Sequence, residues 1–170
     1  DMQSKITDKT KVIIPVHLFG YPVDINQIRT LIANDNIHII EDAACGFGSY
    51  INGVHVGTTG TFGCFSFHPR KAVSTGEGGM ITTNNEEYAN RLRSLRNHGM
   101  DVIDPTNELA NKPYNMLDHS YAGYNFRMTD IQAALGTSQM KRADDILSSR
   151  EIVAQRYNHA FHANDLIGIP

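Results

Sequence analysis

Two residues of this chain, Asp42 and Lys71, have the types and surroundings that carbonyl chemistry needs. Asp42 follows an apolar, strand-like run, so its carboxylate falls at the end of a predicted strand. Lys71 lies between a second apolar run and a glycine cluster, where partial desolvation gives its amine access to the neutral, nucleophilic form. Such an amine forms a Schiff base with an aldehyde, and a nearby carboxylate keeps a pyridine nitrogen protonated. Together the two residues predict a site for pyridoxal phosphate (PLP), whose ring is then an electron sink.

The elements that must position Asp42 begin with a predicted βαβ unit. Residues 11–19 and 37–40 have the apolar pattern of buried strands, and a helix capped by Asp24 is expected between them. A strand, a helix and a strand within about 30 residues favour a parallel sheet. We therefore expect an α/β fold with a mainly parallel sheet flanked by helices. Ligands bind at the carboxyl ends of strands in such sheets, which is where Asp42 falls.

The remaining expected elements are local signals in chain order. They are a hairpin in 49–61 that turns at Asn52-Gly53, strands at 62–67 and 80–83, a helix from Asn84 or Asn85 through Leu95 that Gly99 ends, a long surface loop over 100–123, a long helix capped by Thr129-Asp130, and a further helix over 150–161. A long irregular loop in a compact domain is often functional.

The composition excludes several classes of protein. The chain has 170 residues and a net charge of −3, which gives no basic surface for nucleic acid or an anionic membrane. No apolar run reaches the roughly 20 residues of a membrane helix. Two cysteines fit a reducing compartment, so we expect a cytoplasmic protein. His159 and His162 share a helix face without a cysteine or carboxylate cluster, so no metal site is predicted.

Three segments give the chain a resemblance to a known family. They are residues 40–44, 123–136 and 65–79, the last of which reads FSFHPRK and then, after a short spacer, GEGG. They resemble the DegT/DnrJ/EryC1/StrS family of PLP-dependent aminotransferases, which act on nucleotide-linked keto-sugars. The resemblance places Lys71 at the Schiff-base position and Asp42 at the pyridine nitrogen. It also implies that residues 1–170 are part of the large domain of a fold-type I enzyme. The start of that domain and a C-terminal small domain would lie outside them, and these residues alone would be inactive.

The resemblance implies further cofactor contacts. Ser66 would contact the cofactor phosphate, and Asn125 would reach the phosphate of the neighbouring subunit, so a homodimer with shared active sites is expected. Ala44 and Cys45 would lie beside the cofactor, although the family usually has glutamine at the position of Cys45. On local grounds alone, Ser66 could bond its own backbone and Asn125 could belong to a turn before the next helix.

Two histidines are candidates for substrate contact. His17 ends the first predicted strand, and His68 lies three residues before Lys71. A histidine that is buried in the core and fully hydrogen-bonded is the more common outcome for a residue such as His17.

The implied reaction moves an amino group from an amino acid, expected to be glutamate, to a nucleotide-linked keto-sugar, in nucleotide sugar and polysaccharide biosynthesis. Lys71 would also act as the general acid and base. Three alternatives stay open. A sugar dehydratase of the same family usually has histidine in place of the lysine, a catalytically silent or regulatory relative would agree with Cys45, and an α/β binding domain without PLP would make Asp42 and Lys71 a coincidence.

Overall fold

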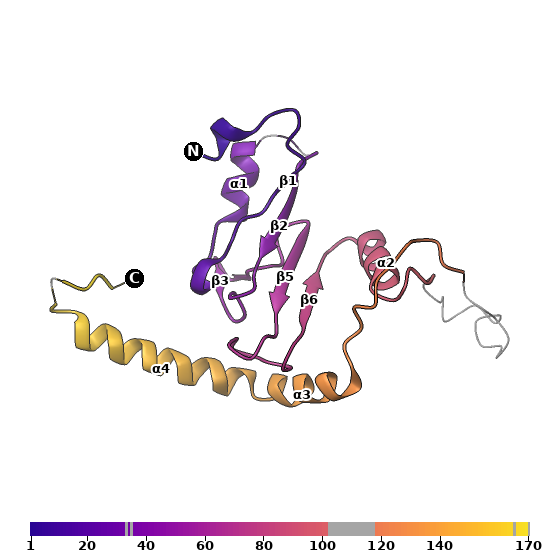
Figure 1. The fold of residues 1–170 in the computed structure, drawn as a ribbon. Helices are drawn as coiled ribbons and strands as arrows, with labels where there is room; N and C mark the ends of the chain where they lie inside the picture. The colour runs from indigo at the N-terminus through magenta and orange to yellow at the C-terminus, as the bar shows by residue number, and fades with distance from the viewer. Residues whose placement is uncertain (33, 35, 102–117, 165, 170) are drawn as a thin grey trace.

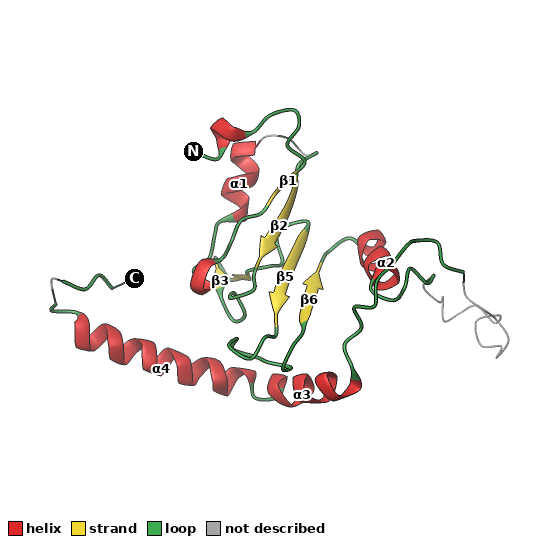
Figure 2. Cartoon of the chain, in the orientation of Figure 1, coloured by secondary structure: helices red, strands yellow, loops and turns green. Residues whose placement is uncertain are grey.

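The computed structural model describes residues 1–32, 34, 36–101, 118–164 and 166–169. A four-stranded sheet with the order β1-β2-β5-β6 forms its centre (Figure 1). Three strands run parallel, and the fourth, β6 (Gly79–Thr82), is antiparallel to its neighbour; the parallel strands are β1 (Val12–Ile13), β2 (His38–Asp42) and β5 (Phe62–Ser66). Figure 2 shows helices on several sides of this sheet. The prediction of an α/β fold with a mainly parallel sheet is confirmed.

The βαβ unit forms as expected, but its first strand is shorter than predicted. Helix α1 (Ile25–Ile32) begins after Asp24, whose carboxylate accepts a hydrogen bond from the N–H of Gln27 at 3.0 Å. β1 ends at Ile13, because Pro15 has no N–H to contribute to a ladder. Beyond it, Val16 pairs with Asp42 in an isolated bridge. The prediction of a buried strand over 11–19 is therefore wrong, since β1 is a short edge strand and Ile14 is exposed.

The predicted hairpin is present between β2 and β5. Its strands are β3 (Tyr50–Ile51) and β4 (Val54–His55), which pair antiparallel. Asn52 and Gly53 both have positive φ, at 51° and 77°, as the tight turn requires. After the hairpin, the chain passes so close to β5 that a Cβ on Gly63 would lie 1.9 Å from the carbonyl oxygen of Gly57.

The longer helices begin at the predicted caps. Asn85 caps α2 (Glu86–Leu95) by accepting a hydrogen bond from the N–H of Tyr88. Thr129 and Gln132 form a reciprocal capping box at the start of α3 (Asp130–Met140). α4 (Ala143–Phe161) follows after a break at Lys141 and Arg142, so the last predicted helix begins earlier than expected. Two short 3₁₀ turns complete the elements, η1 (Gln3–Lys5) and η2 (Leu18–Gly20). Of the predicted loop over 100–123, residues 102–117 lie outside the described residues.

The buried core is small and lies on and around the parallel strands. Its apolar members are Ile25, Ile37, Ile39, Ala43, Val56, Phe67 and Val73. α3 contacts the loop before β6, where the side-chain amide of Gln132 donates to the carbonyl of Glu77 at 2.9 Å. Figure 1 shows α3 and α4 below the carboxyl ends of β2 and β5. Among the described residues, no helix is both long enough and apolar enough to cross a membrane.

Candidate active site

The carboxyl ends of β2 and β5 bring two of the predicted site residues to one edge of the sheet. Asp42 ends β2, and Ser66 ends the neighbouring parallel strand β5. Asp42 pairs in register with Cys64, and side chains alternate along a strand, so Asp42, Cys64 and Ser66 project from the same face. The adjacent phenylalanines, Phe65 and Phe67, therefore project from the other face.

A tight turn follows Asp42 and fixes the next predicted residues. The N–H of Ala44 donates to the Asp42 carboxylate at 3.0 Å, and the N–H of Gly46 donates to the carbonyl of Ala43 at 2.8 Å. Ala44 is half-buried, whereas Cys45 is exposed at the top of the turn. Asp42 itself is half-buried, so its carboxylate is oriented by the turn and is still open on one side.

Lys71 lies in the loop that follows β5 and reaches the turn after β2. The loop is closed at its base by a hydrogen bond from the N–H of Phe67 to the carbonyl of Gly78, at 2.8 Å. A second turn, in which the N–H of Lys71 donates to the carbonyl of His68 at 2.9 Å, points the lysine back over the sheet edge. Its Nζ lies 3.1 Å from the Sγ of Cys45. The amine thus lies within three residues of Asp42 along the chain, as the sequence predicted.

Ser66 and His68 lie in the same loop entrance. The N–H of His68 approaches the hydroxyl of Ser66 at 3.3 Å, so the serine is held by the backbone of its own strand end. The Nδ1 of His68 accepts from the N–H of Arg70, and its Nε2 faces Glu77 at 3.8 Å. With 39% of its side chain exposed, His68 remains open to a ligand.

Asn125 lies apart from this group. It pairs with Asn97 in an isolated bridge just beyond the end of α2, and it is exposed. The flanking amides of Tyr124 and Phe126 donate to the carbonyls of Leu95 and Arg96, which fixes the segment. Within the parts of the chain that the structure describes, no hydrogen bond joins Asn125 to Asp42, Ser66 or Lys71.

His17 is in the core and not at a surface that substrate could reach. Its side chain is only 1% exposed, its Nδ1 accepts from the N–H of Val23, and its Nε2 lies 2.9 Å from a carboxylate oxygen of Glu41. Since Nδ1 accepts a hydrogen bond, the proton of the neutral ring is on Nε2. The structure therefore contradicts the expectation that His17 contacts substrate.

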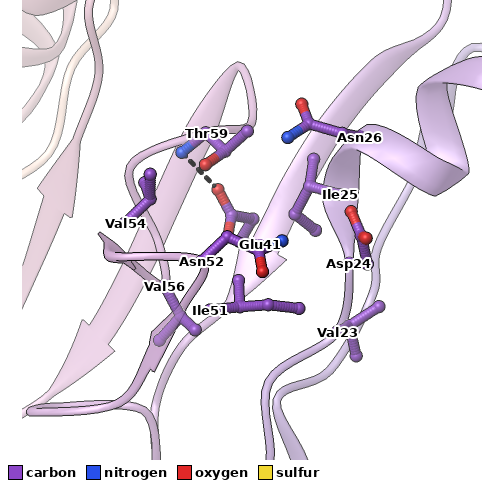
Figure 3. Close-up of a pocket in the computed structure, with 10 residues that line it drawn as sticks. All are labelled: Val23, Asp24, Ile25, Asn26, Glu41, Ile51, Asn52, Val54, Val56 and Thr59. Atoms are coloured by element: carbon purple, nitrogen blue, oxygen red, sulfur yellow. Dashed lines mark hydrogen bonds between the residues drawn. The ribbon is translucent and has the colours of Figure 1, made fainter.

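Glu41 is the polar residue that the sequence did not reveal. It is fully buried, and its carboxylate accepts hydrogen bonds from the amides of Gly57 and Thr59, at 2.7 and 2.8 Å, and from that of Gly60. Figure 3 shows Glu41 in a small cavity of about 30 Å³, with the bond to Thr59 marked. That cavity has room for about one water molecule and is not a substrate site. The signal available in the sequence was the period of two, which places Glu41 and Asp42 on opposite faces.

A larger cavity lies on the face that carries Phe65 and Phe67. It has a volume of about 730 Å³ and is bounded by β5, β6 and α3. Its lining is mostly apolar, and Asp42, Ser66 and Lys71 do not contribute to it. The chemistry-bearing edge of the sheet is therefore separate from this hollow.

Cys64 reports on the electrostatics beside Asp42. Burial raises the pKa of the Cys64 thiol above its ordinary value, and the negative charge of Asp42 raises this pKa further. This effect agrees with the pairing of the two residues across β2 and β5.

Comparison with known proteins decides which family has this arrangement. The family model described as the DegT/DnrJ/EryC1/StrS aminotransferase family matches residues 1–169. This chain belongs to that family. The resemblance drawn from the segments around Asp42, Lys71 and Asn125 is thus confirmed at the level of the family.

Individual relatives agree with this membership. A GDP-perosamine synthase of Escherichia coli O157:H7 is 40% identical over 157 residues, which are 92% of this chain and 40% of the relative. The aminotransferase PseC of Helicobacter pylori, involved in the biosynthesis of pseudoaminic acid, has a TM-score of 0.85 at 30% identity, covering 96% of this chain and 42% of that one. An E. coli GDP-4-keto-6-deoxy-D-mannose-3-dehydratase with bound hydrated PLP has a TM-score of 0.81 at 27% identity, covering 96% and 43%. This chain therefore spans about two fifths of the length of these relatives.

Proposed function

We propose that the full-length protein is a PLP-dependent aminotransferase that transfers an amino group from an amino acid, glutamate, to a keto carbon of a nucleotide-linked sugar. The observation that carries this proposal is the approach of the Lys71 amine to the turn after Asp42. It brings a nucleophile and an anion to one edge of a parallel sheet. The family membership and the names of the sugar aminotransferases above support the reaction class.

The residues at this edge fit PLP by their chemistry. An amine suits the aldehyde, a half-buried carboxylate suits the pyridinium nitrogen, and the hydroxyl of Ser66 suits the phosphate. When bound, PLP supplies an electron sink for the reacting carbon of the substrate. Ala44 has a defined part in this fit, because its N–H orients the Asp42 carboxylate.

Lys71 and Asp42 then have distinct tasks. The Lys71 amine holds the cofactor when no amino substrate is present, and takes and returns a proton at the substrate carbon once it is free. The Asp42 carboxylate stabilises the protonated pyridine nitrogen by its negative charge. His68, at the entrance of the same loop, is proposed to contact the substrate.

We also propose that the site is completed in a homodimer. Asn125 is exposed and held rigidly beside α2, away from Lys71 of its own chain. A second copy could receive this asparagine at its own cofactor phosphate. The rigid backbone around Asn125 would reduce the entropic cost of that contact.

The test is to mix the full-length protein with PLP and record the visible absorbance band of lysine-bound PLP. Wild type and Lys9→Ala, which removes an exposed lysine elsewhere, should show the band, and Lys71→Ala should lack it. Glutamate should bleach the band, and a nucleotide-linked keto-sugar should then restore it as the aminated sugar forms. A band that persists in Lys71→Ala, or no band in wild type, would overturn the proposal. Loss of water from the keto-sugar without amination would identify a dehydratase instead.

A further inference from the structure

The contact between Cys45 and Lys71 joins the two loops of the candidate active site. The Sγ of Cys45 lies 3.1 Å from the Nζ of Lys71, although 26 residues separate them in the sequence. Cys45 follows β2, and Lys71 follows β5. Among the hydrogen bonds of the described residues, this is the one that the Lys71 amine makes.

Cys45 is presented by a rigid piece of backbone. The turn that holds it is closed by the hydrogen bond from the N–H of Gly46 to the carbonyl of Ala43. On its other side, the carbonyl of Cys45 packs against Gly20, where an added Cβ would lie 3.1 Å from that oxygen. The sulfur is therefore fixed in place more firmly than the flexible four-carbon stem of the lysine that it meets.

We propose that Cys45 is a positioning residue for Lys71. Its sulfur accepts an N–H of the amine and holds Nζ beside the turn that orients Asp42 whenever the amine is free. This inference rests on the proposed function, because a lysine that leaves and rejoins a cofactor must return to one position. A lysine side chain has about 2 kcal/mol of rotamer entropy, so a fixed acceptor shortens the search for that position.

The size of the effect follows from the chemistry of sulfur. A thiol is a weak acceptor, and a typical hydrogen bond is worth about 0.5–1.5 kcal/mol net. Loss of the contact should therefore slow the capture of PLP by about 2- to 12-fold. The identity of the family's usual residue gives the contact its interest, since Cys45 replaces a glutamine and makes this pairing a property of this chain.

The experiment measures how fast the visible band of lysine-bound PLP forms after the full-length protein, freed of PLP, is mixed with the cofactor. Cys45→Ala should slow the rate, and Cys45→Ser should restore most of it, because a hydroxyl oxygen also accepts an N–H. Cys64→Ala, which removes the other thiol, is the matched control and should keep the wild-type rate. A merely structural role would shift the urea midpoint of Cys45→Ala and would not give rescue by serine.

A second measurement requires no change at position 45. Methyl methanethiosulfonate should cap the exposed Cys45 of the Cys64→Ala protein and slow the band by a similar factor, and dithiothreitol should reverse the effect. A rate in Cys45→Ala and in the capped protein equal to that of wild type would overturn the inference. In that case, a band in wild type that is absent from Lys71→Ala would leave the proposed function intact. If wild type forms no band, the proposed function itself fails.

Discussion

Glu41 and Asp42 are adjacent carboxylates on one strand, and the structure gives them opposite situations. Glu41 is fully buried and accepts hydrogen bonds from three backbone amides and from His17. Asp42 is half-buried, and one described amide, that of Ala44, donates to it. A carboxylate whose oxygens are all occupied can hold a fold together but has nothing left for a ligand. The number of donors aimed at each acid therefore separates the structural residue from the candidate site residue.

The register of the sheet explains how two neighbours come to differ. Glu41 pairs with Gly63, which has no side chain, and Asp42 pairs with Cys64. The face of Glu41 is covered by residues 57–60, whose amides point inward. The face of Asp42 leads to the turn that holds Cys45 and to the loop of Lys71. One strand thus supplies a core anion on one face and a site anion on the other.

The sharpest test of this contrast is Glu41→Gln. The amide keeps an acceptor on one side but turns an NH₂ group toward backbone donors on the other, inside the core. We expect the free energy of unfolding to fall by about 3 kcal/mol, a large part of a typical stability of about 5–15 kcal/mol. Urea denaturation of the full-length protein measures this. The same chemical change one residue later, Asp42→Asn, should cost less than about 1 kcal/mol. Equal losses for the two variants would remove the distinction.

Asp42→Asn should have its main effect on chemistry. Loss of the negative charge leaves the pyridine nitrogen without its stabilising partner, and we expect the rate of amine transfer to fall about a hundredfold. The fall should be in kcat, with the protein still folded and still able to form the visible PLP band. Asp8→Asn, which neutralises an exposed carboxylate elsewhere, is the matched control. An Asp42→Asn protein with the activity of this control would exclude Asp42 from the site.

A smaller effect is expected at Cys64, the thiol that faces Asp42. Burial raises the pKa of Cys64 above its ordinary value, and Asp42 raises it further, so less reactive thiolate is present at neutral pH. Asp42→Asn removes the contribution of the charge and should lower this pKa. Alkylation of Cys64 by iodoacetamide, measured in a Cys45→Ser background, should then become faster and reach its half-maximal rate at a lower pH. A rate that does not respond would place the charge of Asp42 away from β5.

Most of the fold was accessible from the sequence because its signals are local. The cap at Asp24, the Asn52-Gly53 turn and the capping box at Thr129 each act within a few residues, and each was confirmed. The first strand was overestimated, because β-branched residues suggested burial while Pro15 interrupted the ladder.

The site was accessible to a different degree. The motif around Lys71 and the end of a strand at Asp42 were sufficient to predict that the two residues meet at one edge of the sheet. The buried Glu41 was not identified, because its partners lie 16 to 24 residues away and are mostly backbone amides, which leave no trace in residue types. The contact of Cys45 with Lys71 also depends on how two loops close in space.

The surroundings of Glu41 have one more consequence. The charge of this acid is balanced by amide dipoles and by the N–H of a neutral imidazole, and no described lysine or arginine lies in an ion pair with it. Dissolved salt weakens attractions between solvated ions, but it has little access to dipoles packed inside a protein. The grip of this acid on residues 57–60 should therefore be nearly the same in dilute buffer and in concentrated brine.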